Sequence, residues 1–373
     1  MTDNVLFIIA AFFLSMVCGF FFIPQIIRFC KEKGLYDKPD GRKIHHNAIP
    51  RLGGISFLPS MLLASLIVIV VYNQNYAGHQ VTLSSWSITF FFCLLLIYGV
   101  GIVDDLVGLG AKTKFSVQTI AAILLPMSGL YINNLYGFLG LYEIPFSVGA
   151  PLTVFIIIFA CNAINLIDGI DGLSAGLSLL ALTGFLICFF REGLHTYCML
   201  IAGLMGVLVS FLYFNLWGDA KKGRKIFMGD SGSLTLGFIL GFLFVKFTMD
   251  NPNVRQFRLD SMILAYTLLI VPTFDVVRVS LVRLYHRKPI FKADKNHIHH
   301  KLMRAGLSQH QTLLCILGLA VSLVIVNILL INTAYFSVIV IINIVLWILF
   351  NMIVNHRIKQ QMLPVFAEVE DNR

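Results

Sequence analysis

The chain has 373 residues, of which 58% are hydrophobic and 13% are charged, with a mean hydropathy of +0.84 and a formal net charge of +9. Soluble proteins carry about 45–50% apolar and about 25% charged residues, so this composition excludes an ordinary soluble fold and predicts an integral membrane protein. Nucleic acid is not an expected partner, because the basic residues of a membrane protein first report its topology. No polar stretch is as long as an independent domain of about 50 residues, so residues 1–373 are expected to form one transmembrane domain.

Apolar runs between charges and turn residues predict an all-α polytopic protein with eleven transmembrane helices. Only Ser261 to Phe274 is free of charge in the ninth of them, before Asp275 and Arg278. The count therefore falls to ten if that segment is re-entrant. The expected spans lie near 5–27, 52–72, 86–103, 115–132, 149–167, 172–190, 194–217, 231–249, 260–281, 311–331 and 334–354.

The distribution of lysine and arginine predicts the orientation. The segments 28–51, 104–114, 218–230 and 275–304 and the C-terminal tail hold 24 of the 28 basic residues. Such an excess marks the cytoplasmic side, which places the N-terminus outside and the C-terminus in the cytoplasm. The expected cytoplasmic segments are loops near 28–51, 104–114, 165–172, 218–230 and 282–310, and a short tail at 355–373.

Five aspartates adjoin apolar helices on this predicted cytoplasmic side. A carboxylate at the end of a membrane span is costly to desolvate unless a cation or a water-filled cleft accompanies it. Basic loops lie on the same side, and carboxylates interleaved with basic residues are typical of sites that hold Mg²⁺ and phosphates together. The five are Asp104, Asp105, Asp168, Asp171 and Asp230.

Each acidic motif also has a purely structural interpretation. The adjacent aspartate pair either binds a cation or only ends the third helix in headgroup water. The spacing of Asp168 and Asp171, with Asn165 three residues earlier, predicts one face of a helical turn, and the alternative is a turn rich in Asp and Gly. Asp230 opens a helix, where it can bind a metal or serve as the N-cap.

Three histidines crowd into one basic segment, Asp294 to Lys301: they are His297, His299 and His300. Zinc binding is an alternative on ligand type alone. The lysines and arginines around them favour phosphate binding or general acid/base work instead.

Five motifs occur in a fixed order along the chain. They are Pro50-Arg51-Leu52-Gly53-Gly54, Asp104-Asp105, Asn165-Leu166-Ile167-Asp168-Gly169-Ile170-Asp171-Gly172, Gly229-Asp230-Ser231-Gly232-Ser233 and His297-Ile298-His299-His300. Together, over almost the whole chain, they resemble the polyprenyl-phosphate N-acetylhexosamine-1-phosphate transferase family. The Arg-Leu-Gly-Gly and His-Ile-His-His forms are similar to the undecaprenyl-phosphate N-acetylglucosamine-1-phosphate transferase branch, so a peptidoglycan precursor is not the expected substrate.

The resemblance implies a phosphoglycosyl transferase of the bacterial inner membrane with its active site facing the cytoplasm. Its substrates are then a UDP-N-acetylhexosamine and undecaprenyl phosphate, and its products are an undecaprenyl-diphosphate sugar and UMP. The implied cofactor is Mg²⁺, with Mn²⁺ as an alternative. Such a reaction begins the synthesis of a cell-envelope polysaccharide, such as O-antigen or teichoic acid.

The resemblance also assigns residues. It makes Asp230 and Asp105 metal ligands, and it places Asp104 and Asp105 beside the reacting phosphates. It makes His299 and His300 catalytic as well. The implied substrate-binding residues, with Phe227 as a candidate to stack on uracil, are Arg51, Lys114, Asn165, Asp168, Asp171, Phe227 and His297.

Several alternatives stay open at this level. Direct attack by the lipid phosphate is favoured, since a phosphate monoester has its second pKa near 6 and is mostly a dianion at neutral pH. The competing mechanism uses an aspartate nucleophile and a covalent intermediate. A transporter of nucleotide sugars or lipid-linked sugars is the alternative function. The sugar epimer, the final glycan and the choice between monomer and homodimer are not determined.

Overall fold

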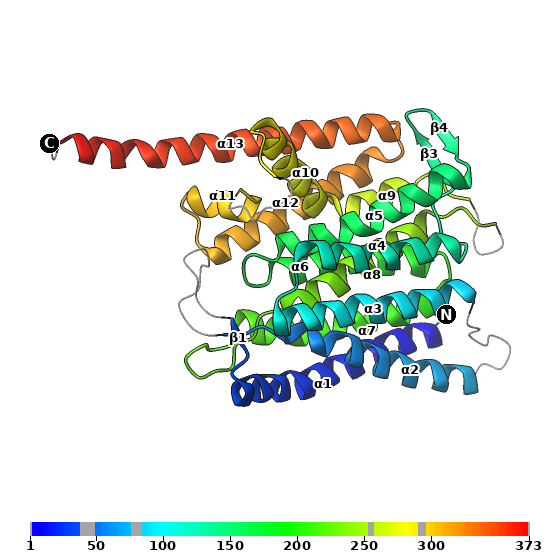
Figure 1. The fold of residues 1–373 in the computed structure, drawn as a ribbon. Coiled ribbons are helices and arrows are strands. Elements are labelled where there is room, and N and C mark those ends of the chain that lie inside the picture. Colours follow the sequence, from blue (N-terminus) through cyan, green and yellow to red (C-terminus); the bar gives the residue numbers. More distant parts are fainter. Residues whose placement is uncertain (1, 38–48, 76–83, 253–256, 290–295, 372–373) are drawn as a thin grey trace.

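The computed structural model describes residues 2–37, 49–75, 84–252, 257–289 and 296–371. Parts of the expected loops near 28–51 and 282–310 therefore lie outside the described residues. The described chain is almost entirely helical (Figure 1). Its helices are α1 (Thr2–Lys33), η1 (Gly53–Ser56), α2 (Phe57–Asn75), α3 (Ser85–Val107), α4 (Ala111–Met127), α5 (Phe146–Ile167), α6 (Leu173–Arg191), α7 (His195–Leu216), α8 (Gly229–Thr248), α9 (Ser261–Leu268), α10 (Ile270–Tyr285), α11 (Ile298–Arg304), α12 (Gln309–Leu330) and α13 (Phe336–Asp371).

Nine helices of the described part are long and apolar enough to cross a bilayer, which confirms the all-α polytopic membrane fold. Helix α4 has 17 residues, fewer than the about 20 that a full crossing needs. It begins four residues before the expected fourth span and ends five residues earlier. The total of eleven crossings and their orientation stay predictions. The nine are α1, α2, α3, α5, α6, α7, α8, α12 and α13.

The expected ninth span is broken in the structure. Helices α9 and α10 are separated only by Leu269 and are bent by 70° relative to each other, so together they form either one broken span or a re-entrant loop. The bend lies in the segment whose charged residues made it the least certain of the predicted membrane spans. Asp275 in α10 is fully buried against protein, so its charge is removed from lipid.

Helix α8 is the central helix of the bundle. Every residue from Ser231 to Thr248 is buried, and α8 packs against α3 and α5. In Figure 1 it lies inside the layers formed by its neighbours, whereas α1 runs along α7 at one edge. The start of α8 lies at the end of the bundle where α1, α3 and α5 finish and α4 and α6 begin. We call this end the site end.

Two short antiparallel pairs of strands were not predicted. Strands β1 (Tyr36–Asp37) and β2 (Ile49–Pro50) pair at the site end, and β3 (Asn134–Phe138) and β4 (Leu141–Glu143) pair at the opposite end (Figure 1). The second hairpin turns through Gly137 and Gly140, which both have positive φ, a backbone region that glycine adopts without strain.

Candidate active site

Asp105 joins the end of α3 to the start of α8. Its Oδ1 accepts the backbone N–H of Asp230 at 2.8 Å, and its Oδ2 accepts that of Ser231 at 2.9 Å. The first amides of a helix lack partners within the helix and favour negative charge. Asp105 is only 5% exposed. It therefore caps α8 and fixes the residue beside it, Asp230, while its predicted role as a metal ligand stays a prediction.

Asp104 and Asp230 converge on a single ammonium group. The Nζ of Lys114, at the start of α4, lies 3.1 Å from Asp104 Oδ2 and 2.5 Å from Asp230 Oδ2. Asp104 Oδ1 also accepts the N–H of Leu109 at 2.6 Å. Asn165 Nδ2 donates to Asp230 Oδ1 at 3.2 Å. The structure thus brings residues from α3, α4, α5 and α8 to one point.

This donor set suits a hard divalent cation that arrives with phosphate. Among the residues that the structure describes, no three His, Cys, Asp or Glu side chains group as a complete set of metal ligands. Mg²⁺, however, is usually held by one or two carboxylates, with water and substrate phosphate oxygens completing its shell. Asp104 and Asp230 offer two carboxylates, and one oxygen of each already lies next to the same positive group, the ammonium of Lys114. The oxygen donors therefore fit Mg²⁺ better than zinc, which prefers nitrogen and sulfur.

Glycines let two motifs interlock beside these carboxylates. A Cβ on Gly54 would lie 2.1 Å from the backbone nitrogen of Gly232, and a Cβ on Gly229 would lie 2.1 Å from the carbonyl oxygen of Arg51. Gly229 also has φ +74°. Arg51 donates its Nε–H to the carbonyl oxygen of Asp105 at 2.8 Å. The Arg-Leu-Gly-Gly motif thus packs directly on the start of α8, and its arginine binds the end of α3.

The loop after α5 is not the helical turn that the spacing of its aspartates predicted. Helix α5 ends at Ile167, so Asp168 and Asp171 lie in a non-helical loop and do not share a helix face. Asp171 Oδ2 pairs with Lys225 Nζ at 2.6 Å. Asn165, still in α5, instead reaches Asp230 and Ser233. A glycine follows each of Asp168 and Asp171, and glycine disfavours a helix. Helix α5 therefore ends before both aspartates, and their side chains do not lie on one helix face.

The histidine segment meets this loop. His299, at the start of α11, is 1% exposed, and a Cβ on Gly169 would lie 2.1 Å from its Nε2. Neither ring nitrogen of His299 has a hydrogen-bond partner within the described residues. Burial lowers the pKa of His299 to about 3, so its ring is neutral at physiological pH. The His300 ring lies beside it, with 4.2 Å between centroids.

Phe227 and His297 are held by contacts that the sequence did not reveal. The N–H of Phe227 donates to the carbonyl oxygen of Pro50 at 2.8 Å, and its own carbonyl accepts the N–H of Gly53 at 2.9 Å. His297 Nδ1 lies 2.8 Å from Asp275 Oδ2. Stacking of Phe227 on a base and contact of His297 with substrate stay predictions.

Comparison with known proteins identifies the family. A family model described as glycosyl transferase family 4 matches residues 87–248. A probable undecaprenyl-phosphate N-acetylglucosaminyl 1-phosphate transferase of Bacillus subtilis (strain 168) is 30% identical over 322 residues, which are 84% of this chain and 82% of the relative. The chain belongs to glycosyl transferase family 4.

Further proteins are similar to this chain over most of their length. The undecaprenyl-phosphate alpha-N-acetylglucosaminyl 1-phosphate transferase of Yersinia pestis is 30% identical, over 83% of this chain and 79% of the relative. The protein of the same name from Escherichia coli (strain K12) is 29% identical, over 82% of this chain and 78% of the relative. The resemblance drawn from the five motifs is thereby confirmed.

Asp168 lies in the loop after α5, where its negative charge is disfavoured. It is partly buried, and burial raises its pKa to about 8, with the carboxylates of Asp230, Asp171 and Asp105 adding to the rise. Asp168 therefore carries a proton at neutral pH until a cation approaches.

We expect Asp168→Asn to stabilise the substrate-free protein at alkaline pH. Between its usual pKa of 3.8 and its folded value of about 8, the folded state binds a proton that the unfolded state lacks. Stability of the native protein therefore falls as pH rises through this window, and asparagine, which does not titrate, removes that fall. Thermal unfolding in detergent should give a higher Tm for the variant near pH 8 and a similar Tm near pH 4. The exposed Asp219→Asn is the control, and identical slopes of Tm against pH in the variant and native proteins contradict the assignment.

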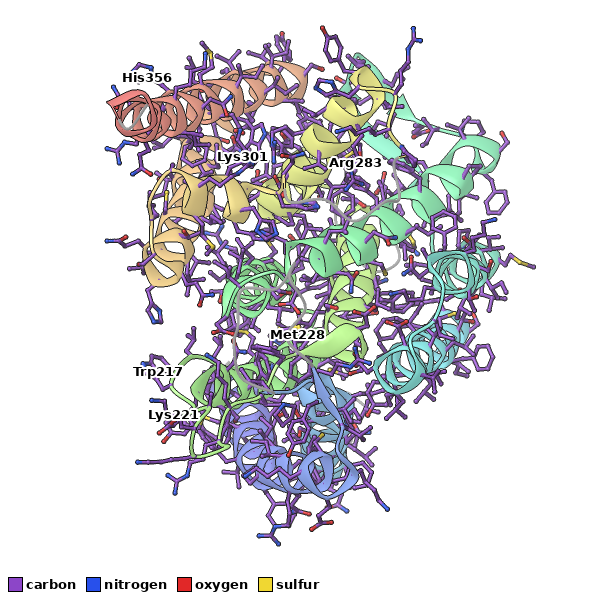
Figure 2. All side chains as sticks on the ribbon, turned by 60° about the vertical axis from the view of Figure 1, so that its left-hand side comes forward. Trp217, Lys221, Met228, Arg283, Lys301 and His356 are labelled. Carbon is purple, nitrogen blue, oxygen red and sulfur yellow. The ribbon has the colours of Figure 1, made fainter. Side chains whose placement is uncertain are left out.

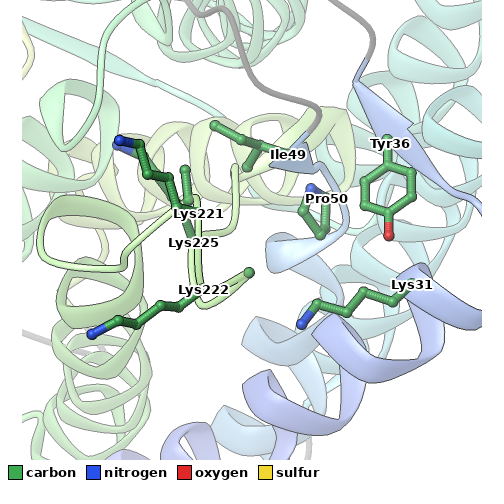
Figure 3. Close-up of a pocket in the computed structure, with 9 residues that line it drawn as sticks. Lys31, Tyr36, Ile49, Pro50, Lys221, Lys222 and Lys225 are labelled. Carbon is green, nitrogen blue, oxygen red and sulfur yellow. The ribbon is translucent and has the colours of Figure 1, made fainter.

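A cavity of about 320 Å³ adjoins the Asp171–Lys225 pair, between the end of α1, strand β2 and the loop before α8 (Figure 3). Figure 3 shows the ammonium of Lys31 turned toward that loop and the hydroxyl of Tyr36 turned toward Lys31, whereas the ammonium of Lys222 points away from Lys31. Basic surroundings raise the local concentration of anions. Among the described residues, the lining holds no acid and four lysines, Lys31, Lys221, Lys222 and Lys225.

Two positioning residues were missed in the sequence. Asn215, near the end of α7, accepts the N–H of Gly172 with its Oδ1 at 2.7 Å and donates to the carbonyl of Ile226 at 2.9 Å. It thereby ties the loop after α5 to the loop before α8. Lys225, the partner of Asp171, lies in a run of basic residues, and nothing in the sequence distinguishes it from the others. The sequence offered one indication of the role of Asn215: an amide side chain at the end of an apolar span needs hydrogen-bond partners when it is buried.

Proposed function

We propose that the protein transfers N-acetylglucosamine 1-phosphate from UDP-N-acetylglucosamine to undecaprenyl phosphate, giving undecaprenyl-diphosphate N-acetylglucosamine and UMP. The names of the relatives support this activity. The observation that carries it is the meeting of Asp104, Lys114 and Asp230 at one end of a membrane bundle. One substrate is soluble and the other is a lipid, so their phosphates meet where membrane spans end.

Charge is the main obstacle that such a site must overcome. A nucleotide diphosphate and a lipid phosphate are both anionic, and their encounter requires preorganised positive charge. We propose that Asp104 and Asp230 hold Mg²⁺, or Mn²⁺ in its place, which supplies neutralisation of phosphate charge when bound. Lys114, whose ammonium lies at these two carboxylates, would add positive charge for the phosphate oxygens. Asp105 keeps Asp230 in place through its bonds to the start of α8.

The remaining residues serve the sugar nucleotide in this proposal. Asp168 and Asp171 border the nucleotide, and Phe227 stacks on its uracil. His299 and His300 contact the sugar phosphate, where the neutral His299 offers one donor and one acceptor. Lys225 and the lysine-lined cavity beside it attract the polyanion toward the site.

Direct attack by the lipid phosphate is the mechanism that we propose. The phosphate is already a dianion at neutral pH, so the site needs no general base. The alternative nucleophile is Asp104 or Asp105, and Asp105 has both carboxylate oxygens bound by backbone N–H groups. Those bonds stabilise its charge and lower its nucleophilicity, which favours the direct route.

The transporter alternative has less support. A transporter places its substrate site near the bilayer midplane. Here the five aspartates Asp104, Asp105, Asp168, Asp171 and Asp230 lie at the site end, at or next to helix termini, and the chain belongs to a transferase family. We propose that the site end faces the cytoplasm of a bacterial inner membrane, because the loops there carry the excess of lysine and arginine.

Release of UMP in detergent is the decisive assay. Purified protein with UDP-N-acetylglucosamine, undecaprenyl phosphate and Mg²⁺ is expected to release UMP continuously, and omission of the lipid should stop the release. A burst of one UMP per protein without lipid contradicts direct attack and supports a covalent intermediate. Absence of UMP under all conditions contradicts the enzyme proposal, and UDP-sugar uptake into vesicles then supports transport.

A further inference from the structure

Asp275 is a buried carboxylate outside the group formed by Asp104, Lys114 and Asp230. It lies in α10 and is fully buried, and its Oδ2 lies 2.8 Å from His297 Nδ1. Its Oδ1 accepts the N–H of Ile298 at 3.0 Å and an N–H of Arg278 at 2.7 Å. A buried charge persists only when hydrogen-bonded or paired. Two of these three donors belong to the first residues of the histidine segment.

The bond to Asp275 fixes the orientation of the His297 ring. An ionised carboxylate only accepts hydrogen bonds, so Nδ1 of His297 carries the proton and donates it. Nε2 is then the nitrogen that faces away from Asp275. The same carboxylate accepts the first N–H of α11, which is an unsatisfied donor in an uncapped helix. One side chain thus orients both the ring and the helix.

The arrangement continues from His297 to the carboxylate loop. The rings of His297 and His299 are nearly parallel, with 6.0 Å between centroids and 6° between planes. His299 in turn lies against Gly169, next to Asp168. A contact that does not involve Asp275 joins α11 to α13: Lys301 Nζ donates to Asn351 Oδ1 at 2.8 Å. Figure 2 shows Lys301 close to α13.

We propose that Asp275 is a positioning residue of the transfer reaction: by orienting His297 and the first turn of α11, it holds His299 against Gly169 beside Asp168. Its effect on turnover rests on the proposed function, in which the histidines contact the sugar phosphate. Its effect on the placement of α11 does not. The two effects can therefore be measured separately.

Asp275→Asn tests the proposal in the full-length protein in detergent. The amide keeps the size of the side chain but loses the charge and one acceptor. Hydrogen exchange, followed by mass spectrometry, should accelerate at least about tenfold in a peptide covering residues 296–304 and stay unchanged in α8. Modification of His299 by diethyl pyrocarbonate should accelerate likewise. The kcat for UMP release should fall about tenfold to a hundredfold, as is typical when the partner that orients a functional histidine is lost. UDP affinity should stay within about twofold.

Asp260→Asn is the matched control. Asp260 is also an ion-paired aspartate, 2.5 Å from Arg258, but it adjoins the opposite end of the α9–α10 pair. Its substitution should change neither exchange in 296–304 nor kcat. If Asp275→Asn unfolds the whole bundle, Asp275→Glu replaces it: the charge is kept, the carboxylate is displaced by one methylene, and the same changes are expected at smaller size.

Unchanged exchange in 296–304 together with a kcat within about twofold of the native value overturns the proposal. Faster exchange with an unchanged kcat also overturns the positioning role, because α11 has then moved without consequence. If the native protein releases no UMP, the proposed function fails instead, and exchange in 296–304 still reports whether Asp275 holds α11.

Discussion

Substitution of Asp230 by asparagine is expected to lower the rate of UMP release by at least about a thousandfold, because it removes one of the two carboxylates that converge on Lys114. Asparagine keeps the size of the side chain, and the backbone N–H of residue 230 still donates to Asp105. The fold should therefore survive. The rate is measured in detergent with saturating substrates, and folding is checked by size exclusion and thermal unfolding.

The control for this substitution is Asp219→Asn. Asp219 lies in the loop between α7 and α8, and its side chain is 44% exposed and lies 4.0 Å from the Nζ of Lys222. Its Oδ1 accepts the backbone N–H of Lys221 at 2.8 Å, a bond that the oxygen of an asparagine side chain can also accept. The same chemical change there should leave the rate within about twofold. A folded Asp230→Asn protein with near-normal turnover contradicts the placement of the cation at Asp104 and Asp230.

Removal of divalent cations is expected to abolish turnover reversibly. Without a cation, the ammonium of Lys114 alone faces two carboxylates and the incoming phosphates, and the repulsion between anions is uncompensated. EDTA should reduce UMP release to background, and Mg²⁺ or Mn²⁺ in excess should restore it. Restoration by zinc alone contradicts the oxygen-donor assignment and supports the histidine zinc site. Thermal unfolding with and without Mg²⁺ gives a second readout, since a bound ion stabilises the folded state.

Long apolar helices could be predicted well from the sequence. The expected spans 172–190 and 194–217 differ by only one residue at each end from α6 and α7, because charges and glycines bound them clearly. Helix α4 was displaced toward the N-terminus, since Lys112 and Lys114 begin the helix instead of preceding it. The break at Leu269 has no local sequence signal of its own. It depends on how the polar side of α10 is buried by the rest of the bundle.

The motifs indicate which residues lie together at the site end, whereas the pairing of their side chains could not be predicted. Asp104 and Asp105 are neighbours in sequence and look equivalent. The structure separates them, because Asp105 points to the start of α8 and Asp104 to Lys114. Likewise, the helical spacing of Asp168 and Asp171 had no consequence once α5 ended at Ile167. The contacts of Asp105 and Lys114 with residue 230 join positions 125 and 116 residues apart, and one sequence does not show such pairings.

The complete enclosure of α8 has a consequence for biogenesis. Its apolar window has a mean hydropathy of 1.5, against 2.1–2.9 for the other eight candidate spans. Serine, threonine and Lys246 all lie in its buried surface. A segment of this kind leaves the translocon for lipid less readily than its neighbours do. Helices α3 and α5, against which it packs, are synthesised earlier, so they are already available to receive it as the ribosome completes it.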